Sequence, residues 1–151
     1  MKKTIDYWPN RSDNLVFGVG LCFQNYSVNK TAHSYNEIVK YNNLALRSMP
    51  YQFMPNLVRV GLLMENENWK KVSNIDQNVG LMVKVSPPGQ QRIRALTMAA
   101  SLYEKMKEYK KSLNYYRRLA KQIPNNNMLQ KRIEYLNFMM ENQSTEQEIN
   151  K

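Results

Sequence analysis

The feature that most constrains the fold is a pair of helical apolar patterns, separated by a very short break, within residues 93–126. In the first pattern apolar residues recur in steps of three and four, at Ile93, Leu96, Ala99, Ala100, Tyr103 and Met106. After a two-residue break, a second pattern runs from Tyr109 to Ile123 and stops at Pro124. Two helices joined by so short a turn must lie antiparallel, so this segment predicts an αα-hairpin.

Weaker copies of this hairpin precede it, as expected if one hairpin cannot bury its apolar stripe alone. In each copy a small residue in the first helix is followed by an aromatic residue that opens the second. The small residues are Gly20, Gly61 and Ala100, and the aromatic residues are Tyr35, Trp69 and Tyr109. Because only Gly or Ala lets two helix backbones approach closely, we expect the small residues where the helices of each hairpin touch.

Residues 95–126 resemble the tetratricopeptide repeat (TPR) without a gap. The matching positions are Leu96, Ala99, Ala100, Tyr103, Tyr109, Ser112, Tyr116, Leu119 and Pro124. Residues 13–23 are similar to the first half of the repeat and residues 35–50 to its second half, with an inserted turn at 24–34. The resemblance implies an all-α fold: a right-handed superhelical stack of about three antiparallel, TPR-like helix hairpins plus a C-terminal capping helix.

The same resemblance divides the chain into successive parts. They are the end of a truncated preceding repeat helix (1–11), unit 1 with its long inserted turn (12–50), a divergent unit 2 (51–87), unit 3 (88–126), a capping helix (127–141) and a flexible tail (142–151). Within unit 2 the second helix is expected from Trp69 to Val85. Because the first repeat looks severed, we expect the chain to be the C-terminal domain of a larger protein.

The cysteine count and the length of the apolar runs exclude several classes of protein. Cys22 is the only cysteine, so no disulfide framework or thiolate metal cluster can form within one chain. The N-terminus lacks the apolar core of a signal peptide, and the longest apolar run, residues 15–23, is too short to span a bilayer. The expected compartment is the cytoplasm, or the periplasm if the chain is the tail of a membrane protein.

No catalytic constellation is visible, and neither a cofactor nor a metal site is expected. His33, the only histidine, is placed in the inserted turn, where a solvated loop residue is expected rather than a general base. Cys22 lies in an apolar run without a flanking cation, which favours an inert thiol. Glu65 and Glu67 lie two apart on an expected turn, where solvated acids are favoured over a cation site. The sequence therefore predicts a binding module and not an enzyme.

The first helices of TPR hairpins line a concave groove, and the resemblance assigns this partner-binding role to a set of residues. These are Asn14, Phe17, Leu21, Gln24, Val58, Leu62, Glu65, Arg94, Thr97, Ser101 and Lys105. Leu21 and Leu62 stand where TPR domains that clamp an acidic C-terminus have Asn, so that type of ligand is not expected. The apolar lining either receives an amphipathic helix or extended segment of a partner, or is core covered by the inserted turn or a missing repeat.

The net charge of +10 indicates a second candidate surface, which is basic. Its residues, on the second helix of unit 3, are Lys110, Lys111, Arg117, Arg118 and Lys121. The alternatives are a solvated convex face, or contact with an anionic membrane surface or an acidic partner.

Three functions follow from these features. The first is a protein–protein interaction scaffold that binds a peptide or partner domain in the apolar groove. The second is a soluble tail, since bacterial O-antigen ligases, polymerases and related oligosaccharyltransferases often end in TPR-like segments of this kind; the parent membrane domain would then be a partner. Nucleic-acid binding ranks third, because no RNA-binding motif is present and hairpin packing explains the aromatic residues. The sequence indicates no oligomeric state.

Overall fold

The computed structural model describes residues 12–149, without the side chains at 12–13, 66 and 143–149. This part of the chain contains helices and no β-strand, which confirms the all-α prediction. The helices in chain order are α2 (Ser12–Val28), α3 (Ala32–Ser48), α4 (Phe53–Leu63), the 3-10 helix η1 (Glu65–Lys71), α5 (Ile75–Val85), α6 (Gln90–Lys105), α7 (Tyr109–Ala120) and α8 (Asn127–Ile149).

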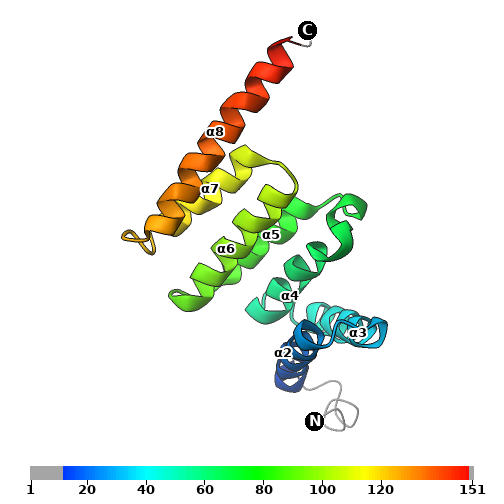
Figure 1. The fold of residues 1–151 in the computed structure, drawn as a ribbon. Helices are drawn as coiled ribbons and strands as arrows, with labels where there is room; N and C mark the ends of the chain where they lie inside the picture. The colour runs from blue at the N-terminus through cyan, green and yellow to red at the C-terminus, as the bar shows by residue number, and fades with distance from the viewer. Residues whose placement is uncertain (1–11, 150–151) are drawn as a thin grey trace.

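The helices pack mainly against their neighbours in the sequence (Figure 1). Helices α2 and α3, α4 and α5, and α6 and α7 form three successive hairpins, and α8 packs on α7. The first helices of the hairpins also contact one another, α2 with α4 and α4 with α6. Helix α3 contacts α4, and α5 contacts α6. As a result α2 and α8 lie at opposite ends of the molecule.

Two apolar cores hold this arrangement together. The smaller core joins α2 and α3 to α4 and contains Leu15, Val19, Ile38 and Val58. The larger core runs from α4 to α8 and includes buried residues of every α-helix between them. Helix α4 supplies both cores, because its successive residues point to different neighbours around the helix axis.

The first hairpin corrects one expectation. The segment expected to be an inserted turn, residues 24–34, is mostly helical, and only three residues, 29–31, lie between α2 and α3. Helix α2 continues because Tyr26, 6% exposed, extends its buried stripe beyond the polar residues that look like a loop. Thr31 then starts α3 with a capping box, in which its hydroxyl accepts from the backbone N–H of Ser34 at 3.1 Å.

The second hairpin contains another departure from the expected pattern. Trp69 lies in η1, and the second helix begins only at Ile75. The side-chain amide of Asn68 holds the 3-10 segment against the first hairpin. It donates to the Tyr35 hydroxyl and to the Leu62 carbonyl, each at 3.1 Å. One of these hydrogen bonds is to the first hairpin and the other is to the end of α4, and together they favour the tighter turn over a continuous α-helix.

The small residues behave differently in the three hairpins. Ala100 is fully buried, and the Ser112 hydroxyl donates to its carbonyl at 2.9 Å, so α6 and α7 do approach closely there. A Cβ built on Gly61 would meet Phe23 of α2 at 3.5 Å and Met98 of α6 at 3.7 Å, so Gly61 packs between hairpins. A Cβ built on Gly20 would meet nothing within 4 Å. The expected close approach at Gly20 is therefore wrong.

The final helix is longer than expected. Asn126 caps α8 by accepting from the backbone N–H of Leu129 at 3.0 Å. Helix α8 continues to Ile149, so residues 142–149, expected to form a flexible tail, are part of this helix. The segment 1–11, expected to end a truncated repeat, lies outside the described residues, as do residues 150–151.

Candidate functional site

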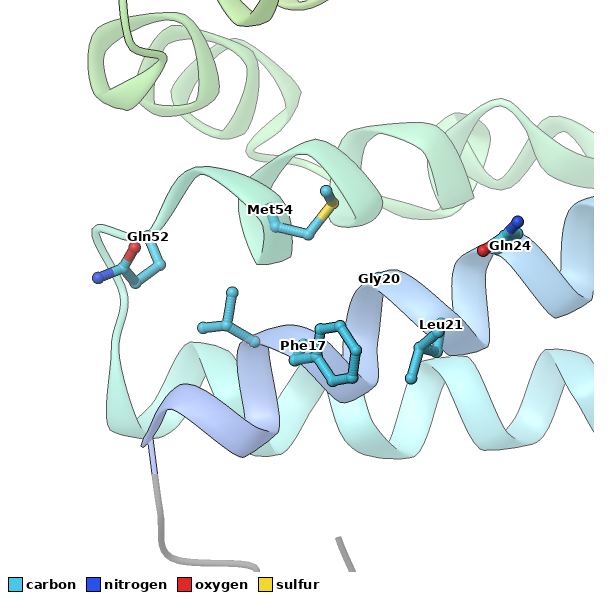
Figure 2. Close-up of a pocket in the computed structure, with 7 residues that line it drawn as sticks. Phe17, Gly20, Leu21, Gln24, Gln52 and Met54 are labelled. Atoms are coloured by element: carbon cyan, nitrogen blue, oxygen red, sulfur yellow. The ribbon is translucent and has the colours of Figure 1, made fainter. Parts of the chain in front are cut away.

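An open apolar groove lies between α2 and the beginning of α4 (Figure 2). Its volume is about 470 Å³. The lining residues are Val16, Phe17, Gly20, Leu21 and Gln24 from α2, together with Met54 from α4 and Gln52, the N-cap of α4. Met54 faces α2 across the groove, and Gln24 and Gln52 lie at its two ends. The groove therefore has an apolar middle and polar ends.

The apolar run of α2 explains how the groove forms. Leu15 and Val19 are four residues apart and fully buried in the smaller core. Phe17 and Leu21, also four residues apart, lie on another face of the same helix and line the groove. Phe17 remains 59% exposed, a large apolar area without a covering partner in the described part of the chain. Gly20 also lines the groove, and it leaves space there because it has no side chain.

The structure brings only some of the predicted groove residues together. Phe17, Leu21 and Gln24 line the groove, whereas Asn14 is half-buried on α2 outside its lining. Val58 is 0% exposed and belongs to the smaller core, so its assignment to a binding surface is corrected. Leu62 is partly buried against the same core.

Glu65 has a structural role in the first hairpin's contact with η1. Its carboxylate accepts from the Tyr26 hydroxyl at 3.2 Å and from the Lys30 ammonium at 3.1 Å. Burial, followed by the charge of Glu65, raises the pKa of the Tyr26 hydroxyl. Glu65 is therefore engaged by its own chain, outside the groove lining.

The residues predicted on α6 do not extend the groove. Arg94, Thr97 and Lys105 are exposed and Ser101 is half-buried, but none of them lines the space between α2 and α4. Sequence reasoning missed Val16, Gly20, Gln52 and Met54 as lining residues. The one available signal was Gly20, whose missing side chain was assigned to helix packing instead.

The predicted basic residues of α7 and its C-cap, Lys121, differ in their contacts. Lys111 is paired, with its ammonium 2.9 Å from Asp76 and 3.4 Å from Glu108. Arg117 donates to the Asn137 side chain at 3.3 Å, and Arg118 lies over the Tyr115 ring at 5.2 Å from its centroid. Lys110 and Lys121 are exposed. The predicted basic surface is therefore partly neutralised, at Lys111.

A polar network at Asp76 joins α5, α6 and α7. The Tyr103 hydroxyl donates to Asp76 Oδ1 at 2.6 Å, and Lys111 donates to both carboxylate oxygens. The hydrogen bond from Tyr103, then the one from Lys111, lowers the pKa of Asp76. Burial and the bond to Asp76 raise the pKa of Tyr103. Tyr103 also stacks on Tyr115, with ring centroids 5.6 Å apart. We assign this network to the packing of the last two hairpins.

His33 and Cys22 are the other reactive side chains considered in the sequence, and the structure places both. His33 lies in the first turn of α3 and not in a loop; its side chain is 75% exposed, and Nε2 is 3.6 Å from Glu37. Cys22 is half-buried on α2 and packs against the smaller core. Within the described residues no group of three or more His, Cys, Asp or Glu side chains is arranged to hold a metal ion.

None of the helices in the described range combines the length and apolar character needed to cross a membrane. Comparisons of the chain with protein-family models, with curated proteins and with solved structures yield no match.

Proposed function

We propose that the chain is a TPR-like stack of helix hairpins that works as a protein-binding module, not as an enzyme. The order of helix contacts supports the stacking: first helices contact first helices, and each of the second helices α3 and α5 contacts the next first helix. This is the nearest-neighbour pattern of a helical repeat protein, in which each hairpin buries its apolar face against the next.

The observation that carries the binding proposal is the exposed Phe17 in the groove between α2 and α4. A volume of about 470 Å³ has room for one or two large apolar side chains. Apolar anchors that fill such pockets supply most of the affinity in many protein interfaces. Gln24 and Gln52 lie at the two ends of the groove (Figure 2). Their side-chain amides are suited to hydrogen-bond the backbone of a bound segment on either side of its anchor. The proposed ligand is therefore a short protein segment with one or two large apolar side chains.

Gly20 offers a test that leaves the fold intact. A leucine side chain at Gly20 would project into the groove, because a Cβ there meets nothing within 4 Å. Gly80 of α5 provides the matched control, since its Cβ position is equally open and Gly80 lies outside the groove lining. Both substitutions replace glycine within a helix, so we expect each to stabilise the fold, by about 0.5–1 kcal/mol.

The experiment uses peptides selected from a random library displayed on phage against the wild-type chain. We expect fluorescence anisotropy to show at least about tenfold weaker binding of these peptides to Gly20→Leu, because a leucine occupies the anchor's space. Gly80→Leu is expected to bind like the wild type. Equal binding by the wild type and Gly20→Leu would overturn the proposal, as would a selection that enriches no peptide.

A further inference from the structure

A second cavity, of about 450 Å³, lies between the beginning of α6 and the end of α7, on elements that do not line the apolar groove. Its lining residues are Pro88, Arg92, Leu96, Arg118, Lys121 and Gln122. Three of these six are cations and none is acidic. Antiparallel packing of α6 and α7 explains the juxtaposition, because it places the start of one helix beside the end of the other.

The three cations of this basic pocket have no carboxylate partner in the described part of the chain. Arg92 donates one guanidinium N–H to the carbonyl of Ser86, and its Nε has no acceptor among the described residues. Arg118 lies over the Tyr115 ring. These contacts orient the two guanidinium groups without compensating their charge. Lys111 and Arg132, elsewhere on the surface, do pair with carboxylates.

The helix dipoles do not offset the positive charge of the basic pocket. The N-terminus of α6 contributes about half a positive charge and the C-terminus of α7 about half a negative charge, so the two nearly cancel. Gly89, the N-cap of α6, supplies no side-chain acceptor for the first-turn amides. The three side-chain charges therefore determine the sign of the field, which favours an anion.

We propose that the basic pocket binds a phosphate group. The guanidinium groups of Arg92 and Arg118 and the ammonium of Lys121 are N–H donors of the kind that bind phosphate oxygens, and a dianion complements three cations better than a single carboxylate does. Gln122 adds a neutral amide, and Pro88 and Leu96 form an apolar wall for the part of the ligand that carries the phosphate. The ligand is accordingly a phosphorylated small molecule or a phospholipid headgroup, two sources of the same chemistry.

The test begins with inorganic pyrophosphate, titrated into the full chain at low ionic strength and followed by NMR. We expect saturable shifts of backbone amides at the beginning of α6 and the end of α7. The double variant Arg118→Gln/Lys121→Gln removes two pocket cations and is expected to weaken binding at least about tenfold. The control Lys110→Gln/Arg117→Gln removes the same charge from the same helix outside the pocket, and is expected to change the affinity less than about twofold.

Vesicles of phosphatidylcholine, with and without phosphatidate, distinguish the two sources. Binding to phosphatidate vesicles that is lost in Arg118→Gln/Lys121→Gln and kept in the control identifies a lipid headgroup. Binding of pyrophosphate alone, with the same dependence on the variants, identifies a free phosphorylated compound.

Two results would overturn the proposal. One is the absence of saturable binding of pyrophosphate and of phosphatidate vesicles to the wild-type chain. The other is an equal loss in the pocket variant and the control, because only the net charge would then matter. Circular dichroism spectra establish that both variants are folded. If the double variant unfolds, Lys121→Gln alone serves, since Lys121 is exposed and follows the last residue of α7.

Discussion

Asp76 of α5 connects the last two hairpins through hydrogen bonds to its charged carboxylate. Its carboxylate accepts hydrogen bonds from Tyr103 on α6 and Lys111 on α7, while 66% of its side chain stays exposed. These bonds form with the ionised carboxylate and lower its pKa. The network therefore stabilises the fold only while Asp76 is charged.

Replacing Asp76 with Asn should lower the free energy of unfolding by about 1 kcal/mol at pH 7, since solvent weakens bonds to an exposed charge. A group whose pKa is lowered by folding stabilises above its unfolded pKa, about 3.9 for Asp, and loses this contribution as pH falls through the folded pKa. The difference between wild type and variant should thus be constant from pH 7 to 5 and shrink below pH 4. Urea unfolding at each pH measures it, and a difference that persists undiminished at pH 2 would contradict the role of the charge.

At the scale of the elements, the turn between α6 and α7 carries backbone strain. Lys107 has φ of 61°, in the left-handed region that residues with a Cβ seldom adopt. The turn keeps this conformation because the Glu108 N–H donates to the Tyr103 carbonyl at 2.9 Å and closes the end of α6. Glycine is the residue that takes such a conformation without steric strain.

Lys107→Gly should raise the free energy of unfolding by about 0.5–1 kcal/mol, because relief of strain exceeds the larger entropy of the unfolded glycine chain. Lys105→Gly removes the same exposed side chain from the last turn of α6. It should lower stability by a similar amount, since glycine disfavours a regular helix. Thermal unfolding of the two variants should therefore give changes of opposite sign. Destabilisation by both would show that the Lys107 side chain, and not its backbone, governs the turn.

The elements also show how far the sequence determines the fold. The hairpin of α6 and α7 was predictable because its apolar residues keep strict helical spacing and Pro124 follows its second helix. The end of α2 was not, because Asn and Ser surround Tyr26, and its burial depends on packing from other helices. Trp69 marked the second helix of unit 2 wrongly, because Asn68 donates hydrogen bonds to the distant Tyr35 and to the Leu62 carbonyl of the preceding helix, and these favour η1.

The candidate sites were predictable to a smaller extent. The TPR resemblance assigned Phe17, Leu21 and Gln24 to a groove, and they line one here because their spacing of four and three residues puts them on one face of α2. Met54 could not be assigned to the same groove, because the sequence does not determine how α4 crosses α2. Arg92 was not connected with Arg118 for a similar reason: they are far apart in sequence and meet only through the packing of α6 on α7.

For the whole molecule, helix α4 is the connection between two cores. Val58 belongs to the core of the first hairpin and Val60 to the core of the last two, and both are 0% exposed. Contacts between hairpins are otherwise between sequence neighbours. In a repeat architecture of this kind, stability is nearly a sum of hairpin and interface contributions, and separate regions can open separately.

The two valines of α4 therefore form a matched pair for testing this coupling. Val58→Ala and Val60→Ala remove the same atoms from equally buried positions of one helix, and each should destabilise the chain by about 1–3 kcal/mol. Their local effects should differ under native conditions. Hydrogen exchange should become faster mainly in α2 and α3 for Val58→Ala, and mainly in α5, α6 and α7 for Val60→Ala. Equal acceleration of exchange in all helices of both variants would mean that the two cores unfold as one cooperative unit. Each substitution would then lower the free energy of opening at every amide by the same amount.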